Sequence, residues 1–365
     1  SDALILKLPH NFKYIPKIQF NIGINDDFFQ NENFATRTDT EVVVAMYHKF
    51  KENCLKYFNG MFSISIYDKK KNEIFLARDK FGIKPLYYNF NKKMFHFSSE
   101  LKSIRKFDKN LVPNAKIFDE FLVFGSIAGK ETFYEKVYKV NPSCYLSVKI
   151  RKKKFLVIEK NYQTKKIIQN YSKKNLEYNF TKILKDVVQD WRNSDAKSGI
   201  FLSGGIDSSL IFKLISKKQN LKTFSFFYSK EDGEFKKIKY ILEKNNHKGK
   251  IFKFSNNNLH KLIKNYSNFF DQPMHDLGNL SLLKLCENMR NRSKLKVVLT
   301  GDGADELFGG YDRHLKYKNE KTDKELILGN NILSVLRLKK IKKMKKLNYL
   351  TNFRLKKFKE IKKKK

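Results

Sequence analysis

The sequence predicts a two-part α/β protein, in which an antiparallel sheet of hairpins is followed by a parallel sheet covered by helices. Residues 55–100 alternate apolar and polar side chains with a period of two. After about residue 175, strand-like segments alternate with helical ones, which is typical of a parallel sheet. The length of 365 residues also fits two domains of ordinary size.

In the first half, the pattern predicts one helix and then four strands. "TDTEVVVAMYHKFKENCLKYF" has helical spacing, with Thr38 or Asp39 as the cap and Glu41 completing a capping box with Thr38. A polar turn, "DKKKN", separates the first two strands. Residues 101–175, rich in Lys and Asn, are expected to form a linker and the edge of this domain. The four predicted strands are "GMFSISIYD", "EIFLARD", "KPLYYNF" and "MFHFSSE".

In the second half, four predicted strands alternate with four predicted helices. The helices are expected over residues 207–217, 234–245, 257–269 and 279–292. Ligands of such folds bind at the carboxyl ends of the strands, where both glycine-rich segments of this sequence fall. The strands are "SGIFLS", "LKTFSFFY", "GKIFKF" and "LKVVLTG".

The first glycine-rich segment, "LSGGIDSS" (202–209), predicts an anion site at the start of a helix. Its two glycines permit a nest of backbone N–H groups, and the helix N-terminus adds to the attraction. Asp207 would repel a bare phosphate, which suggests Mg²⁺ on that phosphate. The segment is not a Walker A loop but matches the SGGxDS pyrophosphate loop, which serves ATP cleavage between the α- and β-phosphates. Taken alone, it leaves open ammonia ligases, tRNA-modifying enzymes, or a tight turn without a ligand.

The second segment, "VVLTGDGADELFGGYDRH" (297–314), places three acids among four glycines after an apolar strand. It resembles the signature of the asparagine synthetase family, class II glutamine amidotransferases with a PP-loop synthetase domain. Other stretches agree with this family, namely "FNGMFSISIYD", "FLARDKFGIKPLYY", "FSSELKSI", "ETFYEKVYKVNPSCYLSV" and "DQPMHD". The resemblance implies a partial Ntn-type glutaminase-like domain over 1–160, a PP-loop (adenine nucleotide alpha hydrolase-like) domain over 175–330, and a basic tail over 331–365, expected to be helical.

The resemblance also implies roles for individual residues. Asp302 matches an acid implicated in forming or using an acyl-adenylate, and Asp39 matches a glutamine-contacting position. Asp207 and Asp305 match Mg²⁺ ligands. The positions that match ATP and pyrophosphate contacts are Leu202, Ser203, Gly204, Gly205, Asp207, Ser208, Phe226, Thr300 and Gly301. The implied reaction activates a carboxylate, that of the aspartate side chain in asparagine synthetases, with ATP. Ammonia from glutamine, or free ammonium, then attacks to give asparagine.

The sequence departs from the family pattern near its two ends. The family's glutaminase uses an N-terminal cysteine, whereas residue 1 here is Ser and the first cysteine is Cys54. Ser1 lacks the matching context for a nucleophile, so the glutaminase half is expected to be impaired or incomplete. At the other end, the family continues well beyond the "GGY", with a lysine that stabilises the adenylate and cannot be placed in the tail. A truncated nucleotide-binding remnant therefore remains an alternative.

Composition argues against several other classes of protein. Cys54, Cys144 and Cys286 form no CxxC or Cys/His cluster, which argues against a disulfide framework or structural zinc and favours a reducing, cytoplasmic location. No apolar run approaches the roughly 18 residues of a membrane span. The net charge of +39 is spread along the chain, so we expect no nucleic-acid partner, although a PP-loop tRNA-modifying enzyme would use this charge. A homodimer is left open.

Overall fold

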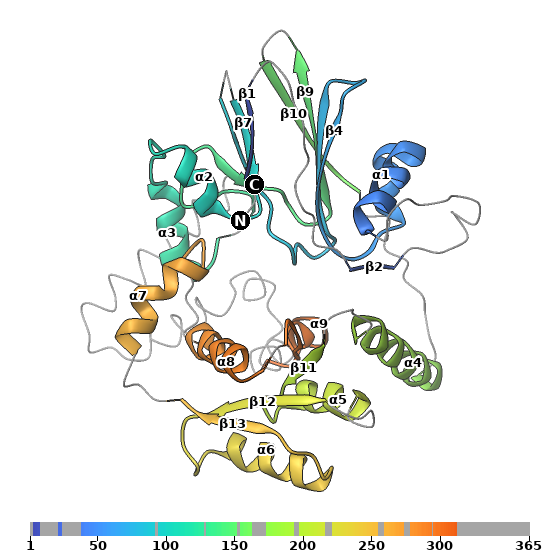
Figure 1. Cartoon of the computed structure of the whole chain (residues 1–365), viewed down its shortest axis with the longest axis vertical. Coiled ribbons are helices and arrows are strands. Elements are labelled where there is room, and N and C mark those ends of the chain that lie inside the picture. Colours follow the sequence, from blue (N-terminus) through green and yellow to red (C-terminus); the bar gives the residue numbers. More distant parts are fainter. Residues whose placement is uncertain are drawn as a thin grey trace, which may run out of the picture. The chain divides into compact units, whose positions relative to one another are not determined.

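The computed structural model describes residues 3–7, 21–23, 38–91, 94–127, 129–151, 154–162, 173–192, 197–215, 221–254, 259–273, 278–293 and 295–311. The chain divides into two compact units (Figure 1). Unit 1 consists of Ser1–Ile168 and Phe270–Pro273, and unit 2 of Gln169–Phe269 and Met274–Lys365. Ser1 and the predicted helical tail over 331–365 lie outside the described residues.

Unit 1 contains two four-stranded antiparallel sheets, as the period of two predicts. One has the order β1 (Ala3–Lys7), β7 (Met94–Ser98), β6 (Tyr87–Phe90) and β8 (Val137–Lys139). The other has the order β10 (Lys154–Asn161), β9 (Cys144–Arg151), β5 (Glu73–Arg78) and β4 (Ser63–Asp68). A short pair, β2 (Asn21–Gly23) and β3 (Asn59–Met61), completes the strands described in this unit.

Side chains of β5 alternate between two cores and so show how the layers of unit 1 are built. Ile74 and Leu76 belong to the core that also holds apolar residues of β6 and β7 from the other sheet. Phe75 and Ala77 face the opposite way, into a core with α1 (Asp39–Phe50) and the 3-10 helix η2 (Lys51–Lys56). On the outer side of the first sheet, α2 (Leu101–Phe107) packs against Tyr87, and α3 (Ala115–Phe124) follows. The two sheets therefore lie between helices (Figure 1).

Two expectations about unit 1 were wrong. The linker expected within residues 101–175 is not found over the described residues of 101–162, because β9 pairs with both β5 and β10 and is buried over its first five residues. The expected edge of the domain is confirmed, since β8 and β10 are the end strands of their sheets. Arg151, Lys154 and Lys160 lie at the exposed ends of β9 and β10, whereas "CYLSV" is a continuous buried run. Thr38 is the N-cap residue of α1, but its side chain makes no capping hydrogen bond, so the predicted capping box is not formed.

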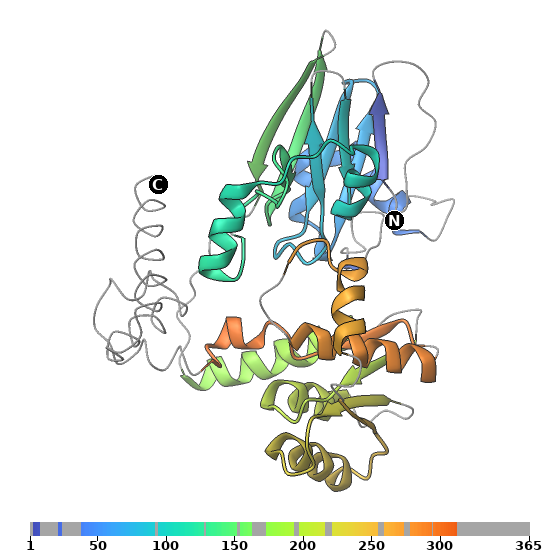
Figure 2. The same ribbon diagram turned by 90° about the vertical axis from the view of Figure 1, so that its left-hand side faces the viewer.

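Unit 2 contains the predicted parallel sheet, in the order β13 (Lys250–Lys253), β12 (Lys222–Phe227), β11 (Ser198–Phe201) and β14 (Val297–Leu299). Helices α4 (Lys173–Arg192), α5 (Ile206–Ile215) and α6 (Gly233–Lys244) share a core on one face of the sheet. Helix α8 (Gly278–Arg292) covers the other face, as Figures 1 and 2 show. The remaining described helices are α7 (Leu259–Phe269) and α9 (Ala304–Phe308). All four predicted strands and four predicted helices are confirmed.

None of the described helices has the length and apolar character needed to cross a bilayer.

The segment Phe270–Pro273 belongs to unit 1, although the helices on either side of it in the sequence belong to unit 2. The Asp271 carboxylate accepts hydrogen bonds from the backbone N–H groups of Leu101 (2.8 Å) and Lys102 (3.1 Å), the first two residues of α2. The N-cap residue of α2, Glu100, makes no side-chain capping bond of its own. Asp271 therefore caps a helix that lies 170 residues away in sequence.

We expect Asp271→Ala to lower the free energy of unfolding of unit 1 by about 1–2 kcal/mol, the usual cost of losing an N-cap. Hydrogen exchange of the Leu101 and Lys102 amides measures this locally, and both amides should exchange faster in the variant. Asp271→Asn keeps one carbonyl acceptor but no charge, so its effect should be intermediate. Unchanged exchange at both amides in Asp271→Ala would show that the cap does not stabilise α2.

Candidate nucleotide site

The two glycine-rich segments leave the same edge of the unit 2 sheet from adjacent strands. Strands β11 and β14 pair in parallel, with Ile200 opposite Leu299. Consequently, the first loop begins at Leu202 and the second at Thr300, at neighbouring positions on the carboxyl edge. This is where open α/β sheets bind their ligands.

The first loop is closed by its own hydroxyl groups. The Ser203 and Ser208 Oγ atoms lie 2.9 Å apart, and Ser208 Oγ also accepts a hydrogen bond from the Ser203 N–H (3.2 Å). The Ser209 hydroxyl donates to the Gly205 carbonyl at 2.6 Å. Leu202, which is buried, holds the start of the loop to the sheet through a bond from its N–H to the Phe224 carbonyl (3.0 Å). The loop therefore has a fixed shape at the N-terminus of α5.

Gly204 is the point at which this loop needs glycine. Its φ of +79° lies in the left-handed region. A Cβ there would also lie 3.2 Å from the Glu234 carbonyl oxygen, from Lys237 Cβ and from Ile238 Cγ1. All three atoms belong to α6, so the loop rests against the first turns of that helix.

The second loop is ordered by short side-chain bonds around its acids. The Thr300 hydroxyl donates to Asp302 Oδ2 at 2.9 Å, and the Tyr311 hydroxyl donates to Glu306 Oε1 at 2.6 Å. Gly303, with a φ of +89°, is the N-cap of α9. A side chain at Gly310 would clash with the Asp305 carboxylate. Asp302 is exposed and Asp305 is half-buried, so solvent and ligands can reach both carboxylates.

The two loops touch at Gly301. A Cβ on Gly301 would lie 2.9 Å from the Ser208 backbone nitrogen and 3.0 Å from Asp207 Cβ. Segments that are about a hundred residues apart in sequence are therefore in contact at the carboxyl edge. The structure brings together six of the predicted residues: Ser203, Gly204, Gly205, Asp207, Ser208 and Gly301.

Phe226 lies on β12, the neighbour of β11, with its ring against Tyr228 at a centroid distance of 5.7 Å and an interplanar angle of 89°. The Tyr228 and Ser281 hydroxyl oxygens lie 2.6 Å apart, which links this aromatic pair to α8. Phe226, a predicted ATP contact, is thus part of the apolar cluster on the α8 face of the sheet.

The carboxylates of the two loops suit a magnesium ion that is bound mainly by a phosphate. Among the described residues, no three His, Cys, Asp or Glu side chains form a cluster that could hold a metal alone. Mg²⁺ usually takes one or two protein carboxylates and completes its shell with waters and substrate phosphates. Asp207 and Asp305, both half-buried at the loops, fit this smaller requirement.

The described cysteines do not supply a nucleophile for a glutaminase. Burial raises the pKa of the Cys54 thiol to about 12, and it raises the pKa values of Cys144 and Cys286 as well. Because the thiolate is the reactive form, all three remain inert thiols near neutral pH. Cys54 and Cys144 are buried. Asp39, the predicted glutamine contact, is the exposed first residue of α1 in unit 1.

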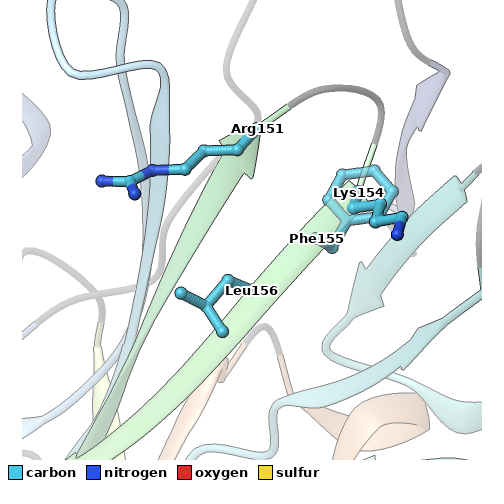
Figure 3. A pocket seen from close by; sticks show the side chains of 4 residues that line it. All are labelled: Arg151, Lys154, Phe155 and Leu156. Carbon is cyan, nitrogen blue, oxygen red and sulfur yellow. The ribbon is translucent and has the colours of Figure 1, made fainter.

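A cavity of about 650 Å³ lies in unit 1, at the hairpin between β9 and β10. Arg151, Lys154, Phe155 and Leu156 line it (Figure 3). Its volume is sufficient for a small molecule. The lining consists of two cations and two apolar side chains, with no acid, base or hydroxyl group for catalysis. The loops of unit 2, by contrast, carry carboxylates and hydroxyl groups.

The fold and the site define a class: a nucleotide-binding α/β unit with a pyrophosphate-type loop, preceded by an antiparallel sandwich of amidotransferase type. Comparison with known families agrees. Residues 23–163 match the glutamine amidotransferase domain, and residues 179–363 match asparagine synthase. The chain belongs to the asparagine synthase family.

Named relatives agree with this assignment. A Methanocaldococcus jannaschii protein, provisionally named asparagine synthetase [glutamine-hydrolyzing] 2, is 34% identical over 293 residues, covering 78% of this chain and 56% of the relative. The asparagine synthetase [glutamine-hydrolyzing] 2 of Bacillus subtilis is 29% identical over 359 residues, covering 85% of this chain and 44% of the relative. The chain thus spans about half the length of these relatives.

Proposed function

We propose that this chain carries the ATP-dependent half-reaction of an asparagine synthetase. A carboxylate oxygen, that of the aspartate side chain, attacks the α-phosphorus of ATP. The bond to the bridging oxygen breaks, and pyrophosphate leaves. Ammonia then attacks the acyl carbon of the adenylate, loses a proton, and displaces AMP to give asparagine. The contact of Gly301 with Asp207 and Ser208 carries the proposal, because it places the pyrophosphate-type loop against the acidic loop.

In this proposal, each loop has its own task. The N–H groups around Gly204 and Gly205, together with the Ser203 and Ser208 hydroxyls, hold the departing pyrophosphate and stabilise its growing charge. Asp207 and Asp305 hold Mg²⁺, which supplies further neutralisation of the phosphates. Asp302 lies on the second loop beside Thr300, where its carboxylate can act on the adenylate or on the attacking ammonia. Leu202 and Phe226 contact the nucleoside, with Thr300 and Gly301 nearby.

We propose free ammonium as the nitrogen source, because the described residues offer no glutaminase nucleophile. Where such a nucleophile is present, Asp39 would contact the bound glutamine. Cys54 and Cys144 are buried, Cys286 is half-buried, and burial raises the pKa of all three thiols, so none of them is a reactive thiolate that could release ammonia from glutamine. A cytoplasmic location is part of the same proposal, since ATP, aspartate and glutamine are all available there.

The experiment is to measure pyrophosphate release by the purified chain with Mg-ATP and aspartate, using ammonium or glutamine as the nitrogen donor. Release with ammonium alone is the expected result. Asp207→Asn should raise the Mg²⁺ concentration needed for half-maximal release by at least about tenfold, because a carboxylate ligand of the metal is lost and even outer-shell partners cost this much. Asp190→Asn, on the exposed face of α4, is the matched control and should behave as wild type. ATP binding without release under any condition would contradict the proposal and favour a nucleotide-binding remnant.

A further inference from the structure

The anion site proposed at the first loop has no cation within the loop itself. Residues 202–209 include no Lys, Arg or His, and they include the acid Asp207. A Walker A loop, by comparison, carries a lysine within the loop that reaches the phosphates. The backbone N–H groups and one Mg²⁺ leave part of the charge of a triphosphate unbalanced. A positive side chain from a neighbouring element would complete the site.

Helix α6 brings a lysine to this loop. Lys237 Cβ lies 3.2 Å from the Cβ position of Gly204, and Ile238, which is fully buried, fixes this part of the helix to the core. The contact places the root of the Lys237 side chain beside the loop. Lys237 itself is exposed, and its flexible four-carbon stem allows the ammonium group to swing toward a bound anion.

Three other lysines on or near α6 have partners, whereas Lys236, the residue before Lys237 on the helix, has no side-chain bond or ion pair within the described part of the chain. Lys239 lies 3.9 Å from Glu243 and over the Phe235 ring, Lys244 donates to the Tyr240 hydroxyl, and Lys213 donates to Asn245. Within the described part of the chain, Lys237 has no ion pair or side-chain hydrogen bond. Its ammonium group is therefore available for a ligand, and Lys237 is the lysine whose Cβ contacts the Gly204 position.

We propose that Lys237 binds the pyrophosphate portion of ATP and stabilises it as the leaving group. This inference rests on the proposed function, and it adds a residue that neither glycine-rich segment contains. The ammonium group would pair with β- or γ-phosphate oxygens, while the loop amides bind from the other side. It would act most strongly when the bond to the α-phosphate breaks, since negative charge then accumulates on the pyrophosphate.

The test measures the dissociation constants of pyrophosphate and of AMP for the full chain by calorimetry. Lys237→Ala should weaken pyrophosphate binding about tenfold, the loss of one charge-assisted hydrogen bond, and leave AMP binding within about twofold of wild type. Lys237→Arg should recover most of the affinity for pyrophosphate. Lys239→Ala, on the same helix, is the control and should change neither constant. The difference between wild type and Lys237→Ala should shrink at about 1 M salt, where charges are screened within about 3 Å.

The outcomes separate this inference from the proposed function. If wild type binds pyrophosphate and Lys237→Ala binds it equally well, the role of Lys237 is overturned while the nucleotide site stands. Equal losses for AMP and pyrophosphate would show that Lys237 only supports the helix, which would also overturn the inference. If wild type binds neither ATP nor pyrophosphate, both proposals fail. Thermal unfolding of each variant checks that α6 remains folded.

Discussion

Asp79→Ala is expected to lower the free energy of unfolding of unit 1 by about 3–5 kcal/mol, the range for uncovering a buried charged partner. Asp79 is fully buried, and its carboxylate accepts backbone N–H bonds from Phe81 (3.1 Å), Ile83 (2.9 Å) and Lys84 (2.9 Å). Alanine would leave all three donors, which are partly buried, without their side-chain partner.

The neighbouring Arg78 increases this cost. Its guanidinium donates to the carbonyl oxygens of Lys84 (2.7 Å) and Val140 (2.8 Å), so it secures the same turn from the other side. Burial lowers the pKa of Arg78, and the charge of Asp79 opposes that shift. Without Asp79, the Arg78 charge would remain buried with carbonyl partners but without its nearby anion.

The measurement is urea unfolding monitored by hydrogen exchange. Exchange is needed because the chain has two units, and only a residue-level probe assigns the loss of stability to unit 1. The amides of Phe81, Ile83 and Lys84 should lose their protection first. Glu100→Ala is the control in the same unit, since its ion pair with Lys102 (3.3 Å) is largely exposed and should contribute less than about 1 kcal/mol. Similar stabilities of the two variants would refute the role assigned to Asp79.

Gly301→Ala is expected to reduce ATP-dependent pyrophosphate release by about 10²-fold, the scale of loss when reacting groups are displaced by about 1 Å. The atoms that a methyl group would meet are the Ser208 backbone nitrogen (2.9 Å), Asp207 Cβ (3.0 Å) and the Asp207 carbonyl carbon (3.4 Å). None of these can turn away, unlike the end of a flexible side chain. The two loops must therefore separate, and Asp207 moves relative to Asp302 and Asp305.

Gly233→Ala provides the matched control for this experiment. Gly233 begins α6, and a Cβ at this position meets nothing within 4 Å. Alanine there should leave the activity unchanged and alter the stability by at most about 1 kcal/mol. If Gly301→Ala keeps more than half of the wild-type rate, the contact between the loops is not needed for the reaction. If it unfolds unit 2, the melting temperature will show it.

Strands β4, β5, β6 and β7 of unit 1 and the four strands of unit 2 could be predicted because their signals are local. Strand β5 illustrates the limit of such signals: the run Ile74–Ala77 predicts a strand, but all four side chains are buried, and only the packing of two sheets and α1 explains why. The same limit explains the error at residues 101–162. Strand β9 is central only because β5 and β10, distant in sequence, pair with it.

The sequence by itself determined the two-part α/β organisation and the two glycine-rich loops, together with the residue types that these loops offer to a phosphate and a metal. These features were predictable because strand period, helix period and turn chemistry are properties of short segments. Tertiary structure alone decided that Gly301 touches Asp207, that Lys237 lies beside Gly204, and that Asp271 caps α2. These contacts join residues far apart in the chain. Their closeness depends on how buried side chains fill the space between elements, which no local pattern records.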